Sequence, residues 1–451
     1  MKKASFKKLA CMMVAILALL VFVGCGNNEE PQAPAQPDAD EVVAEEPAED
    51  EAEEPAPEVA AGDQTTVTFA MWDEVQYPVF QEIVAAFEAE NPDINVVIEL
   101  TPWSQYWINL DSAIVAGTSP DVFWMNSFLP RYALAGVLQP LDEFIARDGV
   151  DLSLYVDMLV NFGSWDGIQY TLPKGVDTVQ VVYNREIFEA HGVDTPQPGW
   201  TWDDMRDIAA QLRDSMAAAE TGEFPIVMEL NAQPSFINFI YQSGGFVLSD
   251  DGLRAGFDQP GTLEAYVDMV ALIDEGLLPS TAVLSDTTGT ELFISELGAM
   301  LFLGSWNLPV VNNASVAPNV GTIAMPARAY GNMSVLGGLG FAMSSIAEDQ
   351  EAAWRLIQFL SGEVSNRMQA EAGIDVPALI SAQQYYHLEY IDTSVIFEAT
   401  TTGFSFPTSP SLAEWFSTMN EISMQIFAGE VSPEDGVAMI QEAIQTALDN
   451  M

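Results

Sequence analysis

The chain has 451 residues, of which 66 are acidic, 14 are basic and 49% are apolar. Its formal net charge of −52 at pH 7 argues against nucleic acid or an anionic membrane surface as a partner, because both require a basic surface. Two cysteines, Cys11 and Cys25, are too few for a disulfide framework. The length exceeds the usual size of a single hydrophobic core and predicts two domains.

The first 25 residues have the two parts of a secretory signal. A lysine-rich start is followed by an unbroken apolar run over residues 9–23. The run is shorter than the roughly 20 residues that an untilted membrane-spanning helix needs. Cys25 follows the small residue Gly24, an arrangement that resembles the lipobox of bacterial lipoproteins. The resemblance implies a signal peptide over residues 1–24 and lipidation of Cys25, whereas the alternative is an uncleaved anchor.

A long acidic segment follows. Residues 27–64 consist mainly of Glu, Asp, Pro and Ala, and they include no aromatic and no basic residue. Such a segment buries too little apolar area to offset its chain entropy, and its like charges keep it extended. We therefore expect residues 25–64 to be a disordered spacer between the lipid-bearing Cys25 and a folded body. An acidic interaction tail is the alternative.

From residue 65 onward, strand and helix patterns alternate, which predicts an α/β fold with a parallel or mixed sheet between helices. Ligands of such sheets bind beyond the carboxyl ends of the strands. Two of these ends carry an aromatic and a polar residue together, Trp72 with Asp73 and Trp124 with Asn126. The expected strands cover residues 65–72, 94–100 and 120–126, and the expected helices cover residues 77–92 and 103–117.

The most specific stretch is DGIQYTLPKGVDTVQVVYNREIFEAHGVDTPQPGWTWDDMRDIAAQL (166–212). It closely resembles a segment of the extracellular solute-binding proteins of ABC importers, the sugar-binding family that includes maltodextrin-binding protein. Thr201 is a good helix N-cap and two aspartates follow it, so much of this motif is scaffold, and Trp200 and Trp202 are not assigned to the ligand. The matching positions are Tyr183-Asn184, Phe188, Gly192, Pro196 and Trp202-Asp203-Asp204.

Further segments follow the family order, so the resemblance covers essentially all of residues 65–451. It implies a two-lobed fold like that of periplasmic binding proteins, type II-like, with mixed sheets flanked by helices and a ligand cleft between the lobes. Three segments would cross between the lobes near Gly175, Met325 and Ile374. The implied N-terminal lobe comprises residues 65–175 and 326–374, and the implied C-terminal lobe comprises residues 176–325 and 375–451.

The resemblance also implies a function. A carbohydrate would be captured between the lobes by hinge closure and delivered to the membrane permease of an ABC transporter. The protein would act as a monomer without enzymatic activity and without a cofactor. The lipid on Cys25 would hold it at the outer face of the cell membrane, extracellular or periplasmic, and raise its effective concentration near the permease.

The ligand residues follow from the chemistry of a sugar, whose C–H faces suit aromatic rings and whose hydroxyls suit carboxylates and amides. In the resemblance, three tryptophans match aromatic positions that stack on the ligand, and Asp177 matches a carboxylate that contacts it. The remaining candidates are assigned only from their positions in the sequence. The expected ligand set is Trp72, Asp73, Trp124, Asn126, Asp177, Gln233, Trp306 and Trp415.

Two other functions compete with carbohydrate uptake. The same fold could bind a polyamine, a peptide or a metal chelate, because a cationic ligand suits an acidic protein. An exported glycoside hydrolase would need two carboxylates placed across a sugar, and carboxylates are too abundant here to discriminate. The sequence GGLGFA (337–342) lacks the spacing of a phosphate loop, and His191 and His387 lack partners at metal-ligand spacing.

Overall fold

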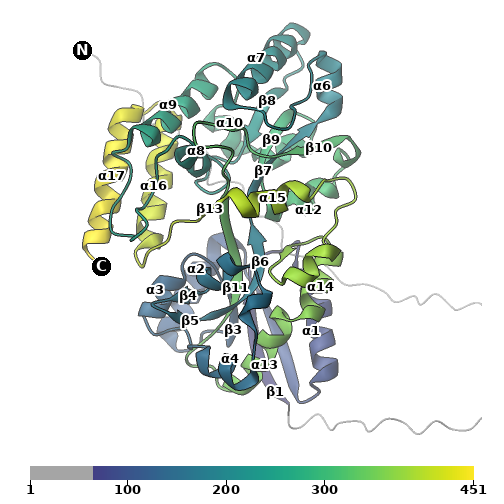
Figure 1. Ribbon diagram of the computed structural model, residues 1–451, viewed down its shortest axis with the longest axis vertical. Helices are drawn as coiled ribbons and strands as arrows, with labels where there is room; N and C mark the ends of the chain where they lie inside the picture. Colours follow the sequence, from purple (N-terminus) through teal and green to yellow (C-terminus); the bar gives the residue numbers. More distant parts are fainter. Residues whose placement is uncertain (1–63) are drawn as a thin grey trace, which may run out of the picture. The chain divides into compact units, whose positions relative to one another are not determined.

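Two mixed β-sheets organise the described part of the chain, residues 64–451 of the computed structural model (Figure 1). These residues belong to one compact unit. The expected signal peptide, the lipidation site Cys25 and residues 25–63 of the expected spacer lie outside the described residues. Among the helices of residues 64–451, none is both long enough and apolar enough to cross a membrane.

The first sheet has the strand order β12-β6-β11-β3-β1-β2, and β13 pairs beside β11. Its strands are β1 (Thr65–Met71), β2 (Ile94–Leu100), β3 (Val122–Met125), β6 (Thr171–Asp177), β11 (Val335–Met343), β12 (Val376–Pro377) and β13 (Phe404–Ser405). Strand β1 runs parallel to β2 and β3, whereas β11 runs antiparallel to both β3 and β6. The carboxyl ends of β1, β3 and β6 therefore lie at one edge of this sheet.

Helices cover both faces of the first sheet. They are α1 (Tyr77–Glu90), α2 (Trp103–Ala116), α3 (Leu129–Leu134), α4 (Asp142–Asp148), α5 (Asp157–Phe162), α13 (Gln350–Ser361) and α14 (Glu363–Glu371). Successive strand residues point to opposite faces. In β1, Phe69 packs with residues of α1 and α13, whereas Ala70 packs with Tyr106 and Leu110 of α2.

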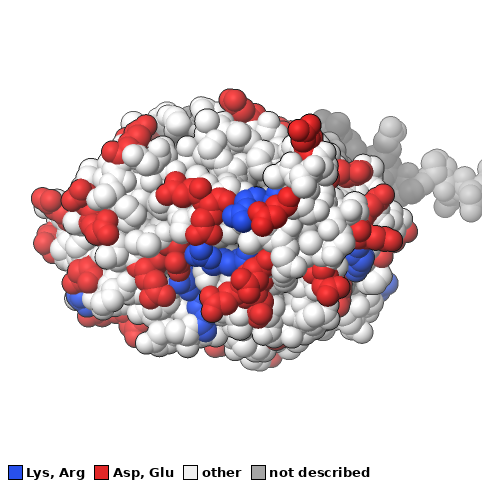
Figure 2. Space-filling view, turned by 90° about the horizontal axis from the view of Figure 1, so that it is seen from above, with Lys and Arg blue, Asp and Glu red and all other residues white. Residues whose placement is uncertain are grey.

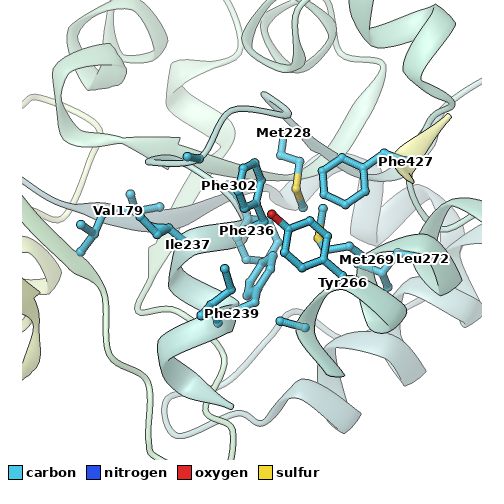
Figure 3. Close-up of a cluster of buried hydrophobic side chains, with 14 of the residues drawn as sticks. Val179, Met228, Phe236, Ile237, Phe239, Tyr266, Met269, Leu272, Phe302 and Phe427 are labelled. Carbon is cyan, nitrogen blue, oxygen red and sulfur yellow. The ribbon is translucent and has the colours of Figure 1, made fainter. Parts of the chain in front are cut away.

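The second sheet has the order β10-β7-β9-β8, with strands β7 (Val179–Asn184), β8 (Phe224–Met228), β9 (Gly298–Gly304) and β10 (Val320–Ile323). Strand β9 is antiparallel to β7 and parallel to β8. Figure 3 shows part of its core, where Tyr266 and Phe427 stack with their ring centroids 5.7 Å apart. A hairpin of β4 (Ser164–Trp165) and β5 (Ile168–Gln169) forms the third, two-stranded sheet.

The remaining helices follow from β7 onward. They are α6 (Arg185–His191), α7 (Trp202–Ala219), α8 (Phe236–Gln242), α9 (Pro260–Asp274), α10 (Thr281–Asp286), α11 (Gly289–Ile294), α12 (Leu308–Asn312), α15 (Ser394–Thr402), α16 (Leu412–Phe427) and α17 (Pro433–Asp449). Short 3₁₀ turns cover η1 (Leu152–Leu154), η2 (Ser305–Asn307), η3 (Ala317–Asn319) and η4 (Ile380–Tyr385). Thr201 caps α7 with a reciprocal bond to Asp204, which confirms the predicted N-cap.

The chain passes from the first sheet to the second and later returns. Strand β6 of the first sheet passes to β7 of the second through Thr178 alone. The return lies between β10, which ends at Ile323, and β11, which begins at Val335. Figure 1 shows β6 and β11 running from the first sheet toward β7. The α/β class with mixed sheets is confirmed, whereas the exact lobe boundaries stay a prediction.

Most of the basic side chains of residues 64–451 form ion pairs. Within residues 64–451, Lys174 and every arginine except Arg185 pair with a carboxylate. On the face drawn in Figure 2, acidic side chains are spread widely and basic ones lie beside them. Exposed pairs of this kind contribute only about 0–1 kcal/mol each to stability. The buried pair of Lys174 is a different case.

Candidate functional site

Strand directions bring the candidate residues of the two sheets toward each other. Trp72 follows the carboxyl end of β1, Asn126 follows that of β3, and Asp177 ends β6. Because β7 begins at Val179 and Val179 pairs with Gly304, the carboxyl end of β9 lies next to the end of β6. Trp306 then follows β9 directly, on the turn η2.

Trp306 is held close to Thr178, where the chain passes from the first sheet to the second. A Cβ atom at Gly304 would lie 2.2 Å from the Trp306 ring, so only glycine allows this close approach. The N–H of Ser305 donates to the carbonyl of Thr178 at 2.8 Å. The hydroxyls of Thr178 and Ser334 are 2.9 Å apart, which ties the crossing strand to the residue preceding β11. Trp306 is partly exposed, so its ring is accessible to a ligand.

Asp177, Gly337 and Gln233 come together from three distant parts of the chain. Asp177 pairs with Gly337 in the sheet register, and a Cβ atom at Gly337 would lie 3.2 Å from Nε2 of Gln233. Both polar side chains are partly exposed. Among residues 64–451, no donor forms a hydrogen bond to the Asp177 carboxylate. This carboxylate is therefore free to accept hydrogen bonds from a ligand.

The electrostatic environment of Asp177 disfavours its charged form. Burial, followed by the negative charge of Asp375, raises the pKa of Asp177 to about 7; Asp73 adds to this rise and Lys174 opposes it. Burial likewise raises the pKa of Asp375, although Lys174 favours its ionised form. The carboxyl group of Asp177 thus titrates close to neutral pH, which is typical of functional sites.

A buried polar chain runs beneath this edge. Lys174 is 1% exposed; it forms an ion pair with Asp375, and its Nζ donates to Oε1 of Gln76 at 2.9 Å. Nε2 of Gln76 donates in turn to Asp73 at 3.1 Å. The ammonium lies 4.6 Å from the centroid of the Trp124 ring. Lys174, on β6, therefore links Asp375, just before β12, to Gln76 at the start of α1.

Aromatic rings extend the site along the first sheet. The ring centroid of Trp72 lies 5.0 Å from that of Trp124, 4.9 Å from Tyr106 and 5.1 Å from Trp103. Trp107 packs against Trp72 at 5.8 Å and against Trp103 at 5.6 Å. Contacts of this kind, edge to face, fix the rings in place.

The structure brings some predicted residues together and buries others. Trp72, Asp73, Asn126, Asp177, Gln233 and Trp306 are partly exposed. Trp124 and Trp415 are 0% and 1% exposed, and they lie in the cores of the first and second sheet regions. Neither therefore offers an exposed ring to a ligand in this conformation, although Trp124 packs directly against Trp72 of the candidate site.

The side chains of Asp73 and Asn126 accept hydrogen bonds from backbone N–H groups close to them in the chain. The Asp73 carboxylate accepts hydrogen bonds from the N–H groups of Val75 at 2.8 Å and Gln76 at 3.2 Å. Oδ1 of Asn126 accepts one from the N–H of Phe128 at 3.1 Å, just before α3. Such side-chain caps position the backbone at the site edge.

Sequence reasoning missed Trp103, Lys174 and Asp375. Lys174 is the only lysine beyond the N-terminal lysines, a rarity that could have marked it for a specific paired role. Nothing in the sequence indicated Asp375 as its partner, because the two are 201 positions apart.

A surface hollow of about 380 Å³ lies away from these residues, beside the connection between α6 and α7. Its one tryptophan, Trp200, is 4% exposed and donates through Nε1 to the carbonyl of Ala324 at 2.8 Å. The hollow thus presents no free aromatic face, and we place the candidate site at the sheet edges. Residues 64–451 contain no group of three or more His, Cys, Asp or Glu side chains arranged to hold a metal ion.

Comparison with known proteins identifies the family. Residues 72–366 match the family of bacterial extracellular solute-binding proteins, and the chain belongs to this family. The maltotriose-binding protein of Pyrococcus abyssi is 25% identical over 307 residues, which cover 64% of this chain and 62% of that protein. The chain thus spans less than two thirds of the length of that relative.

Two further comparisons cover more of the chain. The galactooligosaccharide-binding protein of Bacillus subtilis is 23% identical over 372 residues, covering 81% of this chain and 85% of that protein. An ABC substrate-binding protein of Listeria monocytogenes, solved in complex with cycloalternan, aligns with a TM-score of 0.80 and 23% identity over 86% of this chain and 100% of that chain. The likeness confirms the predicted two-lobed fold, in which the two sheets form the cores of the lobes.

Proposed function

We propose that this protein binds a carbohydrate between the facing edges of its two sheets and delivers it to an ABC transporter permease. The relatives named for maltotriose and galactooligosaccharides, and the neighbour with bound cycloalternan, support this choice of ligand. The observation that carries it is the combination, at the facing edges of the two sheets, of partly exposed tryptophans with an amide and a carboxylate that accepts no hydrogen bond from residues 64–451. Trp72 and Trp306 would cover the apolar faces of a sugar, and Asp177 and Gln233 would bind its hydroxyls.

The proposed function also requires a membrane anchor and a motion of the two lobes. Cys25 would carry lipid and residues 25–64 would separate the membrane from the binding body, which faces the extracellular or periplasmic side. The protein would act as a monomer without enzymatic activity. The lobes, divided near residues 175, 325 and 374, would close on the ligand by rotation at the crossing segments, and the permease would recognise the closed form.

Removing the ring of Trp306 tests this function. The full chain would be titrated with mono- and oligosaccharides, a polyamine, a peptide and a metal chelate by isothermal calorimetry. We expect saturable binding of one sugar class, and Trp306→Ala should weaken it roughly 30-fold, because a buried aromatic contact is worth about 2 kcal/mol.

Leu253→Ala is the control, because Leu253 is 64% exposed and lies outside both the candidate site and the crossing segments. This variant should bind as the wild type does. Binding of only a non-sugar solute would keep the fold and overturn the ligand. Sustained release of cleaved sugar would overturn the binding-protein function itself.

A further inference from the structure

The most exposed tryptophan of residues 64–451 was not among the expected ligand residues. Trp103, the first residue of α2, is 46% exposed, whereas the other tryptophans of this region are partly or fully buried. Single exposed apolar side chains are common on protein surfaces, but the ring of Trp103 packs against Trp72, one of the candidate ligand residues. Its position next to the candidate site therefore requires an explanation.

The ring of Trp103 is exposed but held by its neighbours. It makes edge-on contacts with Trp72, at a centroid distance of 5.1 Å and an interplanar angle of 71°, and with Trp107, at 5.6 Å and 87°. A ring fixed in this way loses little conformational entropy when a ligand stacks on it. Ser104 and Gln105, both exposed, place polar groups on the same turn of α2.

The ring contacts form a series that leads away from the buried Lys174. Trp124 lies next to Lys174, and Trp72 packs against Trp124. Within residues 64–451, Trp103 contacts the rings of Trp72 and Trp107 but not that of Trp124. Along this series of contacts, Trp103 therefore lies farther from Lys174 than Trp72 does.

We propose that Trp103, supported by Trp72 and Trp107, forms an outer subsite for an additional sugar ring, so that the ligand is an oligosaccharide of two or more rings. This inference rests on the proposed function and extends it to the size of the ligand. A monosaccharide held at Asp177 and Trp306 would not use the outer subsite. An oligosaccharide would gain affinity from it.

The test compares ligands of increasing length. The full chain and its Trp103→Ala and Trp103→Phe variants would be titrated calorimetrically with glucose, maltose and maltotriose, and with galactose and galactooligosaccharides. For the series that the wild type binds, Trp103→Ala should weaken binding of the longer sugars roughly tenfold and that of the monosaccharide less than twofold. Trp103→Phe should recover most of the affinity, because it keeps a flat ring.

Ile108→Ala is the matched control, since Ile108 is 59% exposed on the same helix and outside the aromatic cluster. It should bind every sugar as the wild type does. Equal losses for all chain lengths, or no loss in Trp103→Ala, would overturn the outer subsite while leaving the proposed function intact. Absence of sugar binding by the wild type would instead overturn the proposed function, and the subsite with it.

Discussion

Replacing Lys174 by methionine is expected to lower the free energy of unfolding by about 3–5 kcal/mol. The change roughly keeps the length and bulk of the side chain but removes the ammonium from a pair in which the side chains of Lys174 and Asp375 are 0% and 7% exposed. Asp375 would then be a buried carboxylate without a counter-ion, near Asp73 and Asp177. Urea unfolding at pH 7, followed by circular dichroism, measures the effect.

Two companion variants separate charge from packing. In Lys174→Met combined with Asp375→Asn, the uncompensated charge is absent, so much of the lost stability should return. Arg131→Ala removes a surface pair whose side chains are 41% and 39% exposed, and it should cost less than about 1 kcal/mol. A loss in Lys174→Met no larger than that in Arg131→Ala would show that the buried pair is not a major source of stability.

The second large effect is a pH dependence of ligand binding that requires Asp177. Because the pKa of Asp177 is raised to about 7, its carboxyl group is mostly protonated at pH 5.5 and mostly ionised at pH 8. The ionised form accepts the stronger hydrogen bonds from hydroxyl groups. Binding to that form at low pH must release a proton, so the affinity should fall as the pH is lowered below about 7, by at most roughly tenfold per pH unit.

Calorimetric titrations of the bound sugar between pH 5.5 and 8 measure this dependence. Asp177→Asn should bind about 10–100-fold more weakly at pH 8, through loss of charge-assisted hydrogen bonds, and its affinity should vary little with pH. Asp194→Asn changes an exposed aspartate of the second sheet region and should leave the profile unchanged. If Asp177→Asn kept the pH dependence of the wild type, another group would be responsible.

Much of the fold could be predicted because local periodicity reports burial directly. The expected strands and helices of residues 65–126 coincide with β1, α1, β2, α2 and β3 to within two residues at each end. The same periodicity also contained information about individual tryptophans. Trp124 packs against Phe80, with ring centroids 5.3 Å apart, in a strand whose residues are all buried, so the short apolar run VFWM could have placed it in the core.

The burial of Trp415 could also have been predicted from the spacing of apolar residues. Leu412, Trp415, Met419, Ile422 and Ile426 follow the three- and four-residue spacing of a buried helix face, and all of them lie in the core of the second sheet region. The expected contact of Trp415 with a ligand follows from the resemblance alone and stays a prediction. The contacts of Asp177 with Gly337 and Gln233 could not be predicted, because strand order and long-range pairing are properties of the whole chain.

The direct passage from β6 to β7 couples the candidate site to the relative orientation of the two sheets. Asp177 precedes Thr178, the single residue between the two sheets, and Thr178 is bonded to Ser334 on the returning segment. Asp177 belongs to the first sheet, so a rotation of the backbone at Thr178 changes the position of its carboxylate relative to β7 and the second sheet. Under the proposed function, a ligand bound to both Asp177 and Trp306 would fix the angle between the lobes, and a distant partner would sense this angle without touching the sugar.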